Sequence, residues 1–433
     1  MECPATHDLV LQESECANFR LAKPIQICFA CLLMTACLLE QTAARPVDSF
    51  PLSAGGVQIY KHAADIDPAI WNAAFGDSHK DFEYYQLIEQ TMLAGFSYLY
   101  LLLFDEQCDP VALQPLIIVE QDLLATAGSA ITAVINFGRK LWPRLLRTRM
   151  LLAGCLVGDS KPGVIAPANP RRIHGLLAQA LHVFARRQKI SLVSTKDFPA
   201  ALRDELLPFA KAGYTRVGGF PPLTLDLNFT SFDQYMETRL SRITRKSLRR
   251  KLRKAAATSP PITLEVLTDC RQVIDEVYPL YLSVVHNAPV EFEIFSREYF
   301  LEAGQRMPDR HRYFVWRQNG KAIAFSFCTV WNGEIWDNDI GFDYNVAHGL
   351  NLYYRTFHDI VMWALRHGLR RYNCAPFNYD AKLHLRLQPV PVDLYVWHRS
   401  PIINALIRGI APLLAPAKCD VALRKYFRIH NSA

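Results

Sequence analysis

The stretch RYFVWRQNGKAIAFSFCTVWNGEIWDNDIG, residues 312–341, decides the fold of this chain. It contains three mainly apolar runs, 312–316, 322–331 and 334–341, which are separated by Asn-Gly pairs at 319–320 and 332–333. Asn-Gly is the strongest short signal for a two-residue hairpin, because both residues readily adopt the positive φ of a type I′ turn. The stretch therefore predicts three consecutive antiparallel strands.

The segment after these strands predicts a long helix. Apolar residues recur there with a 3.6-residue period, and the pattern stops at His367-Gly368, where the glycine is typical of a helix C-terminus. The members of this stripe are Leu350, Tyr353, Tyr354, Phe357, Val361, Ala364 and Leu365. A strand at 371–374, a short helix from Asn378 and a strand at 390–397 are expected to follow.

The first half shows the same alternation of strands and helices. Strands are predicted at 97–104, 111–119 and 190–194, and an amphipathic helix at 172–188. A chain of 433 residues is about three times the length of a usual domain of roughly 150 residues, which favours two domains. The expected division is a poorly ordered or misassigned segment at 1–50, domains at 51–222 and 223–400, and a helical segment at 401–433.

The composition indicates a globular protein. Half of the residues are hydrophobic and 21% are charged, which excludes disordered, collagen-like and coiled-coil chains. Lys and Arg outnumber Asp and Glu by 48 to 41, so the distribution of the excess matters more than its size. The eleven cysteines have no regular spacing, and Cys28 and Cys31 form a CxxC without a second one, which favours a reduced, cytoplasmic setting.

An apolar run of 13 residues lies near the N-terminus, at 27–39. It is shorter than the roughly 20 residues that a membrane-spanning helix needs. The run has the length of a signal-peptide core, with a faint lipoprotein-like box at 34–37. The alternative, which we favour, is an untidy or misassigned start, with Met34 as an equally plausible first residue.

The order of elements in the second half resembles that of the GNAT acyltransferases, in the tandem-domain branch that includes the FemAB-like transferases. The resemblance rests on four segments in sequence: RITRKSLRRKLRK at 242–254, GFDYN at 341–345 with GLNLYY at 349–354, NYDAK at 378–382 and PVPVDLY at 389–395. It covers residues 226–400 well and 55–225 only by element order. It implies an α/β (α+β) fold of two tandem GNAT-like domains, each a mixed, mostly antiparallel sheet flanked by helices.

The resemblance also implies transfer of an acyl group from a thioester to an amine. It places the phosphate cradle of an acyl-CoA co-substrate at His348, Gly349, Leu350 and Asn351, between a strand and the long helix. The single glycine departs from the glycine-rich pattern of acetyl-CoA binders, and a plain helix start is the alternative. No permanently bound cofactor and no metal are expected.

Several side chains are candidates for proton transfer and substrate binding. The resemblance places Tyr379 where a tyrosine can protonate the leaving thiolate, with packing as the alternative. Asp337 and Asp339 are expected to share one strand face, where mutual repulsion would raise one pKa and supply a base. The candidates for contact with substrate are Lys382, Glu334 and His286.

Two further segments point to an anionic or apolar partner. Nine of the sixteen residues at 239–254 are Lys or Arg, with a narrow apolar stripe of Leu240, Ile243, Leu248 and Leu252. This helix can bind CoA phosphates, tRNA or an anionic membrane surface, or remain a solvated face. The apolar segment at 402–415 is too short to span a bilayer, so it either docks on the protein or lies in a membrane interface.

The leading function is therefore N-acyl transfer from acyl-CoA or another thioester to an amine. The alternatives are a FemAB-like transferase that uses aminoacyl-tRNA and a peptidoglycan-type amine, and a catalytically inactive GNAT-fold binding module. The sequence has no P-loop, zinc or Ser-His-Asp signature, which gives NTPase and hydrolase activities little support. The expected location is cytoplasmic, with peripheral attachment at the inner membrane face as the alternative.

Overall fold

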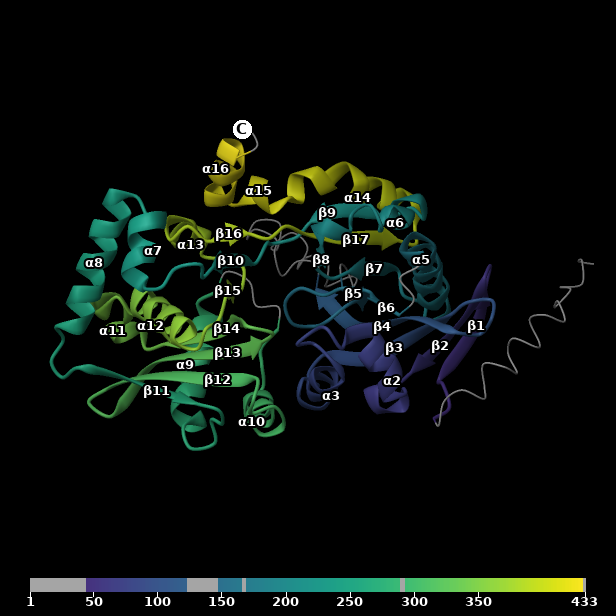
Figure 1. Ribbon diagram of the computed structural model, residues 1–433. Coiled ribbons are helices and arrows are strands. Elements are labelled where there is room, and N and C mark those ends of the chain that lie inside the picture. The colour runs from purple at the N-terminus through teal and green to yellow at the C-terminus, as the bar shows by residue number, and fades with distance from the viewer. Residues whose placement is uncertain (1–43, 123–146, 166–168, 289–292, 431–433) are drawn as a thin grey trace, which may run out of the picture.

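The computed structural model describes residues 44–122, 147–165, 169–288 and 293–430. It has two lobes side by side, each built on one sheet with helices, and the C-terminal helices run along the upper edge of both (Figure 1). Most of the segment expected at 1–50 falls outside the described residues. Its last residues are ordered, since the first strand begins at Asp48.

The first sheet has ten strands and is antiparallel except where β5 and β7 pair in parallel. Its main path is β1 (Asp48–Leu52), β2 (Gly55–Tyr60), β3 (Phe96–Phe104), β4 (Pro110–Asp122), β5 (Arg147–Ala153), β7 (Leu192–Thr195), β17 (Val392–His398) and β8 (Phe198–Pro199). Two short strands lie off this path, β6 (Gly163–Val164) and β9 (Thr215–Gly218). The predicted strands at 97–104, 111–119 and 190–194 are confirmed, with ends that differ by at most three residues.

The second sheet has seven strands in the order β11 (Ile262–Leu267), β12 (His311–Gln318), β13 (Lys321–Trp331), β14 (Glu334–Phe342), β15 (Arg371–Cys374), β10 (Leu223–Asp226) and β16 (Gln388–Pro389). Both Asn-Gly turns are confirmed. Gln318 pairs with Lys321 and Trp331 with Glu334, so each loop has two residues. All four turn residues have positive φ, as the type I′ turn requires.

The last predicted strand forms, but in the first sheet. Residues 392–398 (β17) pair with β7, β8 and β9 of that sheet, whereas β10 and β16 pair within the second sheet. The chain therefore crosses between the sheets from β9 to β10 and again from β16 to β17. Asp393 of β17 is buried and fixed by Arg203, at 2.6 Å, and by Arg216, at 3.4 Å. Local strand patterning does not specify which sheet a strand joins.

Helices form layers on both sheets. In the first domain, α5 (Pro170–Arg187) and α6 (Leu207–Lys211) pack on one sheet face. In the second, one sheet face carries the helices α7 (Phe232–Arg239), α8 (Arg242–Ala256), α11 (Tyr344–Leu350), α12 (Leu352–Arg366) and α13 (Tyr379–His384). We call this face of the second sheet the α12 face.

The opposite face of the second sheet meets the first domain, and we call it the junction face. A single apolar cluster spans this junction, with residues from α2 (Pro68–Phe75), α3 (Phe82–Thr91), α9 (Ile274–His286) and α10 (Arg297–Arg306). Polar contacts add to it: Arg310 lies 2.7 Å from Asp81, and Ser296 donates to the carbonyl of Thr91. The two domains therefore share one core.

Candidate active site

The edge of β14 opens where the two central strands of the second sheet separate. β14 pairs in parallel with β15 only from Glu334 to Asp337, yet it continues beside β13 as far as Phe342. Beyond Asp337, β15 no longer covers this edge of β14. The opening lies close to both candidate aspartates.

A β-bulge in β14 separates these two aspartates. Phe327 pairs with Asp339 and Cys328 pairs with Asp337, so Asn338 is the extra residue. A bulge of one residue shifts the alternation of side chains between the two faces of a strand. The expectation that Asp337 and Asp339 share a face is therefore wrong: Asp337 lies on the α12 face and Asp339 on the junction face.

Asp337 is well supplied with hydrogen bonds. Its carboxyl group accepts from the hydroxyl of Tyr372 at 2.7 Å, from the hydroxyl of Ser326 and from the thiol of Cys328 at 3.7 Å. Burial still raises its pKa, against the opposing effect of these donors. With its oxygens engaged, Asp337 joins β13, β14 and β15.

Asp339 has the opposite environment. Its Oδ2 is buried and has no hydrogen-bond partner among the described residues. Burial raises the pKa of Asp339 to about 8, and the negative charges of Glu293 and Asp337 contribute. A carboxyl group with a pKa near neutrality can accept a proton from an ammonium group, which is what a general base for amine acylation must do.

The first domain contributes charged and aromatic side chains to the junction. His79 packs on Trp336 of β14 with ring centroids 4.4 Å apart, and burial, with Lys80, lowers the His79 pKa to about 3. Lys80 donates to the carbonyl of Val157 and lies 3.2 Å from the carboxylate of Asp159. Lys80 lowers the pKa of Asp159.

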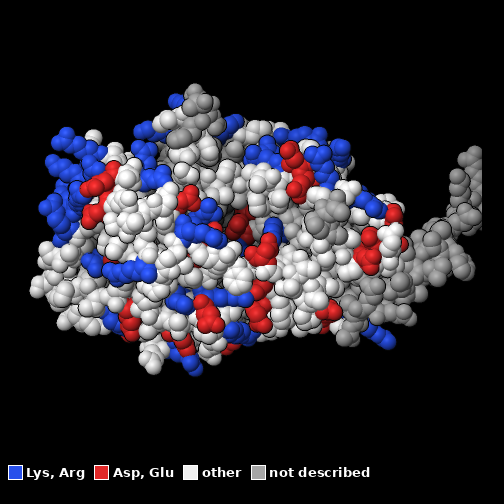
Figure 2. Space-filling view, viewed as in Figure 1, with Lys and Arg blue, Asp and Glu red and all other residues white. Residues whose placement is uncertain are grey.

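A second lysine lies in the same region. Lys196 donates to the carbonyl of Gly158 and contacts Asp197 at 3.2 Å. Burial raises the pKa of Glu293, and the positive charge of Lys196 opposes that shift. Figure 2 shows acidic and basic side chains gathered in a hollow between the two lobes. The junction is therefore an acid-rich site in which buried lysines balance part of the charge.

The segment expected as a phosphate cradle is helical rather than a loop. Residues 344–350 form α11, and Asn351, with φ of +53°, separates it from α12. Gly349 is an exposed helical residue, and an added Cβ would meet no atom within 4 Å. His348 is exposed and Leu350 is partly buried. The start of α12, where helix amides and the dipole favour an anion, is the part of this segment suited to phosphate.

The basic helix α8 reaches the first turn of α12. Lys251 lies over the ring of Tyr354, with its ammonium 3.4 Å from the ring centroid. Leu248 is buried and anchors the helix, but Ile243, expected in the apolar stripe, is 83% exposed. Arg249 forms ion pairs with Asp233 and Glu237. Around α8, at the upper left edge in Figure 2, the surface is nevertheless densely basic.

Tyr379 and Lys382 lie on α13 and are engaged with the protein. Tyr379 is buried, and its hydroxyl donates to the carbonyl of Pro221 at 3.1 Å. Burial raises its pKa. Lys382 donates to the carbonyls of Ala375 and Pro376, which close the turn after β15. In this arrangement both side chains support the fold, and the Tyr379 hydroxyl is not free to meet a leaving group.

The two remaining candidates lie apart from Asp339. Glu334, at the start of β14, accepts from Asn373 at 2.9 Å and from Arg371 at 3.2 Å. It therefore fixes the paired end of β14 and β15 rather than the open end. His286 is exposed at the C-terminal end of α9.

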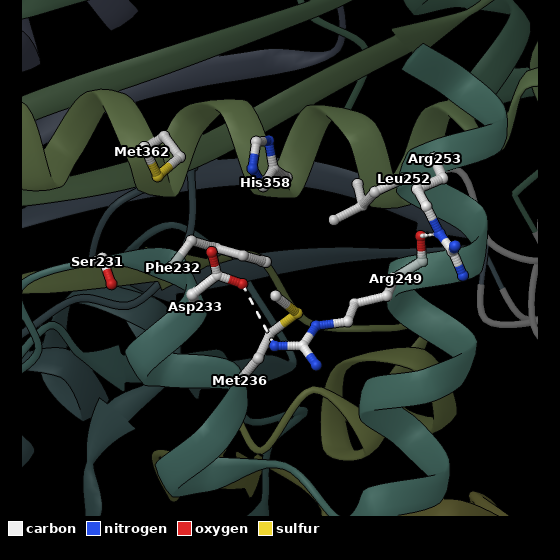
Figure 3. Close-up of a pocket in the computed structure, with 9 residues that line it drawn as sticks. All are labelled: Ser231, Phe232, Asp233, Met236, Arg249, Leu252, Arg253, His358 and Met362. Atoms are coloured by element: carbon white, nitrogen blue, oxygen red, sulfur yellow. Dashed lines mark hydrogen bonds and ion pairs between the residues drawn. The ribbon is translucent and has the colours of Figure 1, made fainter. Parts of the chain in front are cut away.

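A cavity of about 580 Å³ lies between α7, α8 and α12. Its lining combines apolar side chains, among them Phe232, Met236 and Met362, with Arg249 and Asp233, which pair across it (Figure 3). The cavity is on the α12 face, so the sheet separates it from the Asp339 carboxyl. We therefore place the candidate active site at the domain junction. Among the described residues, no group of three or more His, Cys, Asp or Glu side chains is arranged to hold a metal ion.

Sequence reasoning missed the contribution of the first domain. The neighbouring residues His79 and Lys80, together with Asp159 and Lys196, come from three separate loops of the first domain, and none belongs to a recognisable motif. Only the packing of the two domains brings them towards β14. The bulge at Asn338 was equally hidden, because the three consecutive polar residues at 337–339 interrupt the alternating pattern without showing which face each side chain takes.

Comparison with known proteins is consistent with this geometry. Residues 242–383, about a third of the chain, match the family model of the acetyltransferase (GNAT) domain. No curated protein sequence matches the chain.

Solved structures resemble the chain along most of its length. FemX aligns with a TM-score of 0.49 and 8% identity, over 84% of this chain and 100% of its own. A tandem GNAT protein from the clavulanic acid biosynthesis pathway gives 0.47 and 11%, over 80% and 99%. L-PGS from Bacillus licheniformis gives 0.44 and 13%, over 76% and 94%. None of these TM-scores reaches 0.5, so these likenesses carry no argument about the site, and the family model alone describes residues 242–383.

Proposed function

We propose that this chain, whose residues 242–383 match the family model of the acetyltransferase (GNAT) domain, transfers an acyl group from acyl-CoA to an amine at the domain junction. The observation that supports this most directly is the buried Oδ2 of Asp339, which has no hydrogen-bond partner among residues 44–122, 147–165, 169–288 and 293–430 and lies beside the open edge of β14. An amine acceptor approaching from the first domain would meet this carboxylate first.

In the proposed reaction, Asp339 accepts a proton from the acceptor's ammonium group. The neutral amine then attacks the thioester carbonyl and a C–N bond forms. The C–S bond breaks, the nitrogen loses a second proton on becoming an amide, and the departing CoA thiolate takes up that proton. The raised pKa of Asp339 suits this role, because a base titrating near the working pH is both available and strong enough to accept the proton. Glu293 adds negative charge that would attract the cationic acceptor.

We propose that the pyrophosphate of the donor lies at the start of α12, beside Gly349. Helix amides and the helix dipole favour an anion there, and Lys251 of α8 supplies a cation one turn into the helix. The exposed Gly349 leaves room for the phosphates.

The basic helix favours a second candidate donor, an aminoacyl-tRNA. Arg242, Arg250 and Lys254 of α8 are exposed on one edge of the molecule, where a polyanion much longer than CoA could lie (Figure 2). The acceptor would then be a peptidoglycan-type amine. Either donor suits a cytoplasmic setting. Cys155, Cys270, Cys328, Cys374 and Cys419, which form no disulfide among the described residues, also favour it.

Thermal stabilisation separates the two donors. A ligand that binds only the folded state raises its stability by about 2.7 kcal/mol at a concentration of 100 Kd. We expect acyl-CoA to raise the Tm and transfer RNA not to do so at moderate salt. Stabilisation by aminoacyl-tRNA alone would favour the second donor, and stabilisation by neither would contradict both.

Substitutions at the start of α12 locate the donor. Gly349→Val should weaken acyl-CoA binding about tenfold by crowding the phosphates, and Lys251→Gln should weaken it a few-fold by removing one cation. Gly349→Ala is the matched control, because it adds one methyl group in open space and favours a helix. Unchanged acyl-CoA affinity in a correctly folded Gly349→Val variant would contradict binding of the donor at the start of α12.

A further inference from the structure

The helix α14 (Pro401–Leu414) presents an apolar face to solvent. Its large aliphatic residues Ile402, Ile403, Leu406, Ile410 and Leu413 are all exposed, with 82%, 61% and 64% for Ile402, Leu406 and Leu413. At 100° per residue these five side chains fall within one arc of about 100° on the helix. We call them the α14 stripe. Exposed aliphatic residues are normally scattered, whereas a continuous stripe marks an interaction surface.

The inner side of α14 fixes the orientation of this stripe. Asn404 donates to the carbonyl of Gly213 at 2.9 Å and accepts from the amide of His398 at 3.0 Å. Ala411 on the same side is buried, and the helix contacts β9 and β17. The helix is therefore docked on the first domain through its polar and small residues, which holds the apolar stripe outward.

Basic residues flank the stripe. Between residues 399 and 430 there are six Lys or Arg residues and one acidic residue, Asp420. The basic residues are Arg399, Arg408, Lys418, Arg424, Lys425 and Arg428, and all six are exposed. Figure 1 shows α14, α15 (Pro416–Cys419) and α16 (Val421–His430) along one edge of the molecule, and Figure 2 shows basic side chains over the same edge. Arg408 lies on the side of α14 opposite the stripe, so the positive flanks are at the two ends of the helix, Arg399 before it and Lys418, Arg424, Lys425 and Arg428 after it.

This combination selects the occupant. An apolar stripe with cationic flanks matches a surface that is apolar beneath and anionic above, as a bilayer with anionic headgroups is. A symmetric dimer through the stripe would instead bring the same cations of two copies together, which opposes association. Among the described residues, no helix is both long enough and apolar enough to cross a membrane. α14 itself, at about 21 Å, suits a position in the plane of the interface.

We propose that the α14 stripe and its basic flanks form a docking face for an anionic membrane surface, with α14 lying in the interface and the rest of the protein outside it. This inference goes beyond the proposed acyl transfer and does not depend on it, because it concerns binding alone. It combines the two outcomes expected for the segment 402–415. One side of the helix docks on the protein, and the other side remains available to the membrane.

Sedimentation with vesicles tests the proposal on the full chain. We expect the protein to sediment with phosphatidylcholine vesicles containing 30% phosphatidylglycerol, to be released by high salt, and not to sediment with phosphatidylcholine alone. The double variant Leu406→Glu/Leu413→Glu should lose at least tenfold in vesicle partitioning. The matched control is Val47→Glu/Leu93→Glu, which adds the same charge at residues of similar exposure, 58% and 66%, in the first domain.

The outcomes separate the possible occupants. Equal loss in both double variants would overturn the proposal, since charge alone would then explain it. Unchanged partitioning of Leu406→Glu/Leu413→Glu would also overturn it and would assign binding to another segment. Sedimentation velocity without lipid completes the test: self-association of the full chain that the α14 variant abolishes would identify a second copy as the occupant instead. Equal melting temperatures of the two double variants would show that the fold is intact.

Discussion

The two faces of β14 each carry one aspartate, and the environments of these two carboxyl groups are opposite. On the α12 face, Asp337 accepts hydrogen bonds from Tyr372, Ser326 and Cys328. On the junction face, two residues later, Asp339 has a buried oxygen with no hydrogen-bond partner in the part of the chain that the structure describes. Both carboxyl groups have raised pKa values because both are buried, but only Asp339 has an oxygen free to receive a proton from a substrate.

The comparison shows that one bulge gives two nearby aspartates different roles, a stabilising role for Asp337 and a chemical role for Asp339. In a regular strand without the bulge, residues 337 and 339 would point to the same face, and the two carboxylates would compete for the same donors. With it, one carboxylate stabilises the three central strands and the other is exposed to the domain junction. The predictions below compare the two positions, since Asp→Asn at either site replaces a titratable carboxyl group with an amide of nearly the same shape.

The largest expected effect is on turnover. Asp339→Asn should lower kcat/KM by about 10²-fold or more, because an amide cannot accept the ammonium proton. In the unsubstituted protein kcat/KM should rise with pH through about 8, since the base acts only when deprotonated. Steady-state kinetics between pH 6 and 9 measures both. Turnover of Asp339→Asn equal to that of the unsubstituted protein would show that this carboxyl group is not the general base.

The second effect is on the pH dependence of stability. The folded state keeps the Asp339 proton up to a pH of about 8, whereas an unfolded aspartate releases it near 3.9. Between these values the folded state binds more protons, so the contribution of this group to stability falls as the pH rises. Asp339→Asn removes that cost.

Melting temperatures at pH 5 and pH 8 measure this second effect. Relative to the unsubstituted protein, Asp339→Asn should gain about 2 °C or more on going from pH 5 to pH 8. Two Tm curves that run parallel over this range would mean that the carboxyl titrates normally in the folded protein.

The third prediction concerns the other face. Asp337→Asn should lower the free energy of unfolding by about 1–3 kcal/mol, because an amide presents a donor to the hydroxyls that now donate to the carboxyl. Turnover of the folded enzyme should stay within a few-fold of the original. Urea unfolding and kcat together check this. A loss of turnover as large as that of Asp339→Asn would erase the distinction between the two faces.

The fold could be predicted from the sequence wherever local chemistry decides it. The Asn-Gly pairs fixed both hairpins, and the apolar stripe ending at Gly368 gave α12 within two residues. β17 was predicted as a strand but not as a member of the first sheet. Its partners in β7 and β9 are about 175 to 205 positions earlier in the sequence, so no local pattern indicates the pairing. Strand propensity is local, whereas sheet membership is not.

The site was predictable only in part. Asp339 was found by its place on the central strand, and the raised pKa follows from burial. The face it occupies depends on the bulge, and its surroundings depend on loops such as those of His79 and Lys196 in the other domain. The cradle was expected as a loop, but its residues favour a helix, with Asn351 adopting the left-handed conformation that divides it.

The smallest expected effect is at Tyr379. The family resemblance assigned it the role of proton donor to the leaving thiolate, but its hydroxyl is buried and donates to the Pro221 carbonyl. Tyr379→Phe should therefore lower the free energy of unfolding by about 1 kcal/mol, the usual net contribution of one such hydrogen bond, and should leave turnover within a few-fold. Urea unfolding and kcat with a saturating thioester measure the two quantities. A drop in kcat of about 10²-fold with little change in stability would show that α13 rearranges when substrate binds, and that Tyr379 acts as the acid after all.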